Sequence, residues 1–191
     1  DEWEPSYEQG EYLLYFGRVI ECKGLPIIKE LAKHVEMPIR VVGEADEYTR
    51  GFLKDATNLT LEGPVTGKAR SELLRNAYAM LMPTRYTEPF GGAGVEGQLC
   101  GTPLIASDFG AFNETVIHNV TGYRCHTLGD YVEAVRKVKA LNRRQIASIA
   151  RGRYGLDPVG TQMDKIFRQI LALKDQGWYS MKPIDAVWPN P

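Results

Sequence analysis

Two glutamates stand on either side of paired glycines in the segment TEPFGGAGVEG, residues 87–97. Glycines such as Gly91 and Gly92 before a helix let a ligand approach the backbone, and the free N–H groups of a helix start favour an anion. The carboxylates of Glu88 and Glu96 can each accept two hydrogen bonds side by side, which suits the vicinal hydroxyl groups of a sugar. The arrangement therefore indicates a ligand with a central phosphate and a sugar on each side, as in a nucleotide sugar.

The same glycines also match a dinucleotide-binding pattern. Gly92, Gly94 and Gly97 spell G-x-G-x-x-G, but that fingerprint requires its glycines directly after the first strand of the sheet. Here the motif follows the fourth predicted strand, and Pro83 and Pro89 precede it. This context argues against a nicotinamide or flavin site. For the glycines taken alone, a loop that only packs closely against the sheet remains an alternative.

An upstream segment, EGPVTGKAR, resembles a phosphate-binding P-loop but departs from that motif at two positions. Glu62 stands where the first glycine belongs, and Ala69 stands where the motif requires a hydroxyl residue. We therefore do not expect a P-loop in this protein.

Two basic residues, Arg18 and Lys23, follow the first predicted strand in the segment FGRVIECKG. A guanidinium can form a fork of hydrogen bonds to phosphate oxygens, and an ammonium supplies a point charge. An ordinary loop with surface cations is the alternative interpretation. Two cations and a helix start can carry the charge of a diphosphate, and the sequence has no Asp-x-Asp motif. We therefore expect no metal ion and no other cofactor.

Strand and helix patterns alternate along the chain. The predicted strands cover residues 11–18, 37–43, 59–62, 78–83, 102–107 and 122–125. The predicted helices cover residues 24–35, 47–56, 67–77, 91–100, 112–117, 128–140, 143–154 and 159–176. This alternation predicts an α/β fold, a Rossmann-like parallel sheet with helices on both faces. Such sheets bind ligands at the carboxyl ends of their strands, where the strand order reverses.

The domain organisation follows from the same pattern. Residues 1–176 are expected to form one nucleotide-sugar-binding domain. Residues 177–191 carry three prolines and two tryptophans, which predicts an extended C-terminal tail. The chain starts at Asp1 rather than at a methionine, so we expect it to be a piece of a longer protein.

The composition excludes several classes of partner. The chain has 23 basic and 24 acidic residues and a net charge of −1, so we expect no nucleic-acid partner. No apolar run approaches the roughly 20 residues that span a bilayer. The three cysteines are too few and too widely spaced for a disulfide framework and favour free thiols. These features predict a cytoplasmic location.

Four segments in order resemble one family. They are YFGRVIECKG, LEGPV, LLRNAYAMLMPTRYTEPFGGAGVEGQLCGTPLIASDFGAFNETV and NVTGYRC. Together they are similar to the C-terminal, donor-binding half of retaining glycosyltransferases of family 4, which have the GT-B fold. The resemblance covers about residues 12–140, and the combination is more specific than any single motif. It implies an enzyme of carbohydrate biosynthesis, a hexosyl- or glycosyltransferase that uses a nucleotide-diphosphate sugar.

The resemblance also implies roles for individual residues. Arg18 and Lys23 would contact the donor diphosphate, together with backbone N–H groups of Gly91, Gly92 and Ala93. Glu88 would bind the donor sugar near the reacting centre, and Glu96 would bind the ribose. The loops that contain Gly43 and Val65 would bracket the base, and Gly17 and Phe90 complete the predicted substrate site. Glu88, Arg18 and Lys23 form the predicted catalytic set. Gly97 replaces a common alanine and is expected to serve helix packing.

A GT-B enzyme has two such domains, and its reaction takes place in the cleft between them. The resemblance implies that an N-terminal domain with the acceptor site is missing here, so this chain should bind the donor but be inactive alone. A membrane surface, reached peripherally at its inner face, would be contacted through that missing half. Two alternatives remain open. One is a non-catalytic nucleotide-sugar-binding module, and the other is half of a nucleotide-sugar epimerase or sugar phosphorylase of related fold.

Overall fold

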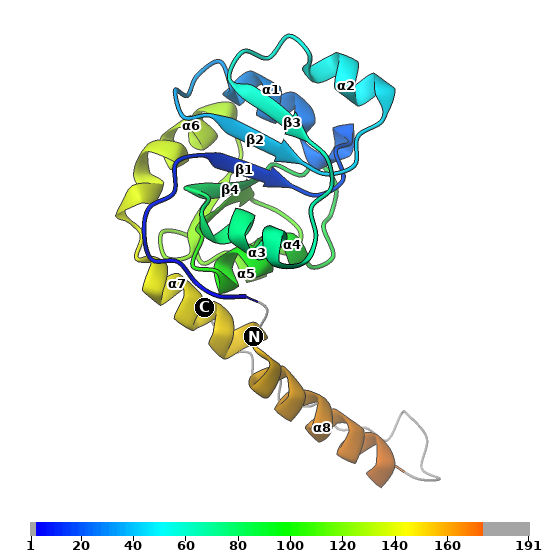
Figure 1. Ribbon diagram of the computed structural model, residues 1–191. Helices are drawn as coiled ribbons and strands as arrows, with labels where there is room; N and C mark the ends of the chain where they lie inside the picture. Colours follow the sequence, from blue (N-terminus) through cyan, green and yellow to red (C-terminus); the bar gives the residue numbers. More distant parts are fainter. Residues whose placement is uncertain (1–2, 174–191) are drawn as a thin grey trace.

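The computed structural model describes residues 3–173 and contains one six-stranded sheet. The strands are β1 (Leu13–Phe16), β2 (Ile39–Val42), β3 (Leu59–Glu62), β4 (Ala79–Met82), β5 (Leu104–Ser107) and β6 (Gly122–Cys125). Their order is β3-β2-β1-β4-β5-β6, and all neighbours are parallel. The predicted α/β fold with a Rossmann-like parallel sheet is therefore confirmed (Figure 1).

The helices connect these strands in the predicted order. They are α1 (Leu25–Leu31), α2 (Glu47–Leu53), α3 (Gly67–Arg75), α4 (Gly92–Leu99), α5 (Phe112–Thr115), α6 (Leu128–Lys137), α7 (Arg143–Tyr154) and α8 (Leu156–Ala172). Two 3-10 turns, η1 (Glu21–Lys23) and η2 (Val138–Ala140), were not predicted as separate elements. The last helix begins at Leu156 rather than at Val159, because a proline such as Pro158 is tolerated in the first turn of a helix. Residues 174–176 of that predicted helix and the predicted tail lie outside the described residues.

Side chains on both faces of the sheet are buried, as expected for a parallel sheet covered by helices. Leu13 and Tyr15 of β1 belong to a core that includes residues of α1, α2 and α6. Leu14 belongs to a second core with residues of α3 and α5 and with Cys100, which follows α4. The alternation along β1 thus sends successive side chains into the two layers of helices.

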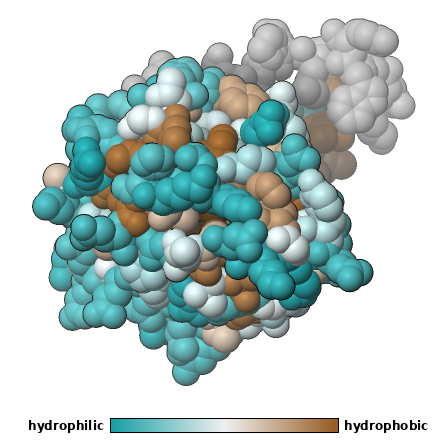
Figure 2. Space-filling view, turned by 90° about the horizontal axis from the view of Figure 1, so that it is seen from above, coloured by the Kyte–Doolittle hydropathy of each residue, from teal (hydrophilic) through white to brown (hydrophobic). Residues whose placement is uncertain are grey.

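The helix α8 differs from the others in its surroundings. It has no buried residue, and Figure 1 shows it projecting away from the sheet and its helices. Seen from above, the side with α1, α2 and β3 is mainly hydrophilic, with apolar residues in patches between polar ones (Figure 2). Among the described residues, no helix combines the length and the apolar character needed to cross a membrane.

The strand order reverses between two central strands. The chain runs outward from β1 through β2 to β3, returns to β4 beside β1, and then runs outward to β6 on the other side. Loops after β1 and β4 therefore diverge from the same point of the sheet edge, which is where sheets of this kind bind ligands.

Candidate functional site

A hollow of about 80 Å³ lies at this switch point. Its lining residues are Tyr15, Phe16, Gly17, Lys23, Met82, Thr84, Glu88, Gly91, Gly92 and Ala93. The structure thus brings together six residues of the predicted site, which come from the end of β1, the loop after β4 and the start of α4.

Close packing between the loops after β1 and β4 positions these side chains. The N–H of Arg85 donates to the carbonyl oxygen of Cys22 at 2.8 Å. Gly24 has a φ of 88°, and a Cβ atom there would lie 1.9 Å from the carbonyl oxygen of Pro83. Only glycine fits this position, because it accepts the left-handed conformation and leaves room for the neighbouring backbone. The contact places Lys23, at the end of η1, directly opposite the loop after β4.

Lys23 and Glu88 form an ion pair in the hollow. The ammonium of Lys23 lies 2.6 Å from Oε2 of Glu88, and the two side chains are only 16% and 9% exposed. The hydroxyl of Tyr86 joins them, since it accepts a hydrogen bond from Lys23 at 2.6 Å and donates to Oε2 of Glu88 at 2.8 Å. Buried charges need such partners, because an unpaired charge would lose its hydration without compensation.

The protonation of Lys23 follows from these contacts. Burial alone would lower the pKa of Lys23, because it disfavours the charged ammonium. The hydrogen bonds with Glu88 and Tyr86 outweigh that effect and hold the pKa of Lys23 above its usual value. Lys23 therefore carries a full positive charge at neutral pH.

The loop after β5 fixes the backbone of Glu88. The N–H of Ala111 donates to the carbonyl oxygen of Glu88 at 2.9 Å. Gly110, with a φ of 62°, lies so close that a Cβ atom there would approach the backbone nitrogen of Glu88 to 2.9 Å. Three strand ends, those of β1, β4 and β5, thus determine where this carboxylate lies.

The start of α4 forms another wall of the hollow. Gly91 is the N-cap residue with a φ of 74°, and no side chain of the described residues caps this end. The first N–H groups of a helix have no acceptor within the helix, so those of Gly92 and Ala93 can donate to a ligand. Gly97 lies deeper, where a Cβ atom would approach the sulfur of Met80 to 2.1 Å. This close approach supports the predicted packing role of Gly97.

Glu96 lies on α4 but does not line the hollow. Its carboxylate pairs with the guanidinium of Arg70, which belongs to α3. That guanidinium also lies over the rings of Phe16 and Trp3, with centroid distances of 5.0 and 5.3 Å. Phe16 lines the hollow as well, so the pair of Arg70 and Glu96 extends the site along the edge of the sheet.

The other predicted residues, which are Arg18, Gly43, Val65 and Phe90, do not line the hollow. Arg18 is exposed on the loop after β1, and its carbonyl oxygen accepts a hydrogen bond from the hydroxyl of Tyr15 at 2.5 Å. Gly43 is buried against that loop, since a Cβ atom there would lie 1.8 Å from the carbonyl oxygen of Gly17. Val65 packs against the second core, and Phe90 is half exposed with its ring 5.9 Å from that of Tyr154.

Thr84 adds a polar group that the sequence did not single out. The residue is 2% exposed and lines the hollow, and its hydroxyl has no hydrogen-bond partner among the described residues. Buried hydroxyl groups in proteins are normally hydrogen-bonded. The hydroxyl of Thr84 is thus a buried group beside the hollow whose hydrogen bond no described residue satisfies.

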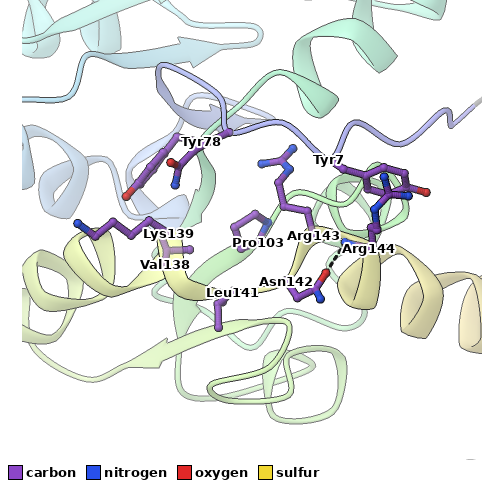
Figure 3. Close-up of a pocket in the computed structure, with 10 residues that line it drawn as sticks. Tyr7, Tyr78, Pro103, Val138, Lys139, Leu141, Asn142, Arg143 and Arg144 are labelled. Carbon is purple, nitrogen blue, oxygen red and sulfur yellow. Dashed lines mark hydrogen bonds between the residues drawn. The ribbon is translucent and has the colours of Figure 1, made fainter.

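A larger hollow, of about 380 Å³, lies at the opposite edge of the sheet. It includes Tyr78 and Pro103, which precede β4 and β5, and the buried Arg143 (Figure 3). The guanidinium of Arg143 donates to the carbonyl oxygens of Ser6, Arg75 and Ala77 and to the hydroxyl of Thr102. These hydrogen bonds link α7, which begins at Arg143, to the N-terminal segment and to the end of α3, so we assign Arg143 a structural role.

The described residues contain no group of three or more histidine, cysteine, aspartate or glutamate side chains placed to hold a metal ion. The cations of the candidate site are Lys23 in the hollow, with Arg18 and Arg70 at its borders. The residues that line the hollow carry a carboxylate, an ammonium, a hydroxyl and helix N–H groups, which together suit a phosphorylated sugar.

Sequence reasoning missed Tyr86, Arg70 and Thr84. Tyr86 and Thr84 lie two and four residues before Glu88, in the same loop after β4, so their nearness in the sequence was an available signal. Arg70 lies 26 residues before Glu96 on another helix. No local pattern connects them, and only the packing of α3 beside α4 brings them together.

Residues 2–153 match the family described as Glycosyl transferases group 1. D-rhamnosyltransferase WbpZ of Pseudomonas aeruginosa is 29% identical over 117 residues, which are 58% of this chain and 31% of that protein. The chain spans between 31% and 48% of the length of the curated relatives it matches.

Solved structures show the same fold. AviGT4, a glycosyltransferase involved in avilamycin A biosynthesis, has a TM-score of 0.76 and 23% identity, and the match covers 90% of this chain and 55% of AviGT4. Anabaena HepE in complex with UDP-glucose has a TM-score of 0.69 and 20% identity, with 83% of this chain and 49% of HepE covered.

Proposed function

Because this chain belongs to the glycosyl transferases group 1 family, we propose that it is the donor-binding domain of a retaining glycosyltransferase. Its ligand is a nucleotide-diphosphate sugar, and the sugar acceptor binds to a further domain of the complete enzyme. The curated relatives are about twice as long as this chain, which leaves room for such a domain in a complete protein.

The ion pair of Lys23 and Glu88 beside the start of α4 carries this proposal. An ammonium has three N–H donors, and Lys23 uses two of them for Glu88 and Tyr86. Its third donor and the N–H groups of Gly92 and Ala93 can bind phosphate oxygens, while Glu88 accepts from sugar hydroxyls. An anion-binding group and a sugar-binding carboxylate therefore lie in one hollow, as a sugar phosphate requires.

We assign the nucleoside half of the donor to the side of Glu96. Arg70 holds that carboxylate in place, and an ionised carboxylate suits the two hydroxyls of a ribose. Solved structures of Anabaena HepE contain UDP or UDP-glucose, which supports a nucleotide sugar as the type of ligand. The loops with Gly43 and Val65 remain assigned to the base.

The proposed reaction transfers the sugar with retention of its anomeric configuration. The bond between the sugar and the diphosphate breaks through an oxocarbenium-like transition state, and negative charge develops on the leaving diphosphate. Lys23, Arg18 and the start of α4 stabilise that charge by fixed positive groups, so we assign no step to a metal ion. Glu88 orients the hydroxyls of the sugar and is not assigned the role of a covalent nucleophile.

Isothermal titration calorimetry of this chain tests the proposal. Three ligand pairs would be titrated in the presence of a chelator: UDP with UDP-glucose, GDP with GDP-mannose, and ADP with ADP-glucose. We expect at least one pair to bind with better than millimolar affinity. If no pair reaches that affinity, the proposed donor site is wrong.

Two variants then test which half of the ligand each glutamate binds. Glu96→Ala should weaken binding of the bare nucleoside diphosphate, and Glu88→Ala should mainly weaken the extra binding that the sugar provides. Each loss should be about tenfold or more, because hydrogen bonds to charged groups contribute about 1.5–3 kcal/mol. Glu36→Ala, which removes an exposed glutamate, is the control and should bind as the unchanged chain does. Equal losses for both ligands in both variants would contradict this division.

A further inference from the structure

The hydroxyl group of Tyr86 connects the two charged groups of the hollow. It accepts a hydrogen bond from the ammonium of Lys23 at 2.6 Å and donates to Oε2 of Glu88 at 2.8 Å. The ammonium also lies 4.7 Å from the centroid of the tyrosine ring, within the range of a cation–π contact. Tyr86 therefore restrains the cation and the carboxylate at the same time.

These contacts converge on one oxygen of the Glu88 carboxylate. Lys23 and Tyr86 both bind Oε2, and within residues 3–173 no side chain or N–H group donates to Oε1. An ionised carboxylate accepts at both oxygens. The arrangement thus directs one oxygen to the protein and leaves the other, together with one N–H of Lys23, for a ligand.

We propose that Tyr86 is a positioning residue for the sugar half of a nucleotide-sugar donor. Its hydroxyl holds Glu88 so that Oε1 accepts from a sugar hydroxyl, whereas the contact of its ring with Lys23 does not depend on the hydroxyl. This inference rests on the proposed function, since it names the group that organises the same site. Without the phenolic hydroxyl, the carboxylate can rotate and present both oxygens to Lys23, which withdraws them from the sugar.

The substitution Tyr86→Phe tests this role, because it keeps the ring and removes the hydroxyl. The quantity to measure is the sugar increment, defined as the dissociation constant of a nucleoside diphosphate divided by that of the matching nucleotide sugar. It is measured by calorimetry with the tightest pair among UDP and UDP-glucose, GDP and GDP-mannose, and ADP and ADP-glucose. We expect the sugar increment to fall by about fivefold or more, as for one lost hydrogen bond, while the nucleoside diphosphate binds nearly as before.

Two further variants separate positioning from a general structural effect. Tyr48→Phe removes the hydroxyl of a tyrosine that is 71% exposed on α2, and its sugar increment should equal that of the unchanged chain. In a Glu88→Gln background, Tyr86→Phe should cause little additional loss, because the carboxylate that Tyr86 positions is no longer there. A full additional fivefold loss in that background would contradict the inference.

A third measurement avoids any dependence on the folding of Tyr86→Phe. Difluorotyrosine introduced at position 86 keeps the shape of the side chain but lowers the pKa of the phenol toward neutrality. As the pH rises through that value, a phenolate forms beside Glu88, so the sugar increment should fall in this protein and stay constant in the unchanged chain. A constant sugar increment in both proteins would overturn the inference.

The outcomes distinguish this inference from the function on which it rests. If no pair binds to the unchanged chain, the proposed function and the role of Tyr86 fall together. If a pair binds and Tyr86→Phe leaves the sugar increment unchanged, or weakens both ligands equally, only the role of Tyr86 is overturned.

Discussion

The two glutamates of the candidate site are each paired with a cation from a different element. Lys23 of η1 pairs with Glu88, and Arg70 of α3 pairs with Glu96. Such pairing compensates for the hydration that partly buried charges lose. Both carboxylates are thus held in place before a ligand binds, which reduces the conformational freedom lost on binding.

At the scale of single residues, Thr84 gives a sharp prediction. Thr84→Val replaces the buried hydroxyl, which has no partner among the described residues, by a methyl group of similar size. We expect this change to raise the free energy of unfolding by up to about 1 kcal/mol and to weaken nucleotide-sugar binding about fivefold, since it removes an unsatisfied group and a ligand contact. Thermal unfolding and calorimetry would measure these opposite effects. Unchanged affinity would show that the hydroxyl does not contact the donor.

At the scale of elements, the site depends on where loops leave the sheet. The loop after β1 packs on the loop after β4 through Gly24 and Pro83, and the loop after β5 bonds to the backbone of Glu88. Backbone atoms make these contacts, so a larger side chain at a position such as Gly24 would collide with the neighbouring loop. The helix α4 then turns its free N–H groups toward the hollow and its later glycines toward the sheet.

The two ends of α4 should therefore respond differently to the same substitution. Gly92→Ala meets only Phe90, at 3.9 Å, so it should leave the melting temperature nearly unchanged but hinder the approach of the diphosphate and weaken its binding. Gly97→Ala places a methyl group against Met80 and should lower the free energy of unfolding by about 1–3 kcal/mol, as for other overpacked cores. Denaturant unfolding and calorimetry of both variants would measure these effects. The reverse pattern would contradict this division of α4.

For the whole molecule, the function proposed above assigns only donor binding to this chain. The hollow opens at the carboxyl edge of one sheet, and the match to solved relatives covers about half of each of their chains. The donor-binding residues proposed above all lie in this sheet domain. None of them is assigned to bind an acceptor.

We therefore predict that these 191 residues bind a nucleotide sugar without transferring it efficiently. Release of the nucleoside diphosphate from the tightest-binding donor would be followed by a coupled assay, with simple sugars and alcohols as acceptors. We expect almost no release above the background, because no acceptor is held against the anomeric carbon. Robust turnover would show that this chain forms a complete site by itself.

The sequence alone was enough to predict every strand of the sheet and the parallel topology. Apolar stretches such as 37–43 and 102–107 alternate with helical patterns, and this alternation leaves few arrangements other than a parallel sheet. The position of Glu88, Gly91 and Gly92 after a strand also predicted that they lie together at the carboxyl edge, as they do. Local patterns are sufficient for this prediction because the carboxyl ends of parallel strands all lie at the same edge of the sheet.

Which side chains contact one another depends on how the elements pack. Tyr86 bridges Lys23 and Glu88, and Lys23 lies 63 residues before Tyr86 and 65 residues before Glu88 in the sequence. Arg70 pairs with Glu96, which follows it by 26 residues. These contacts depend on the distance between loops and on the packing of α3 beside α4, which no spacing in the sequence specifies. The order of strands and helices in the sequence was enough to predict the edge of the sheet where the candidate site lies and the types of charge found there. The fold determined how those charges pair, because pairing depends on distances of a few ångströms between elements far apart in the chain.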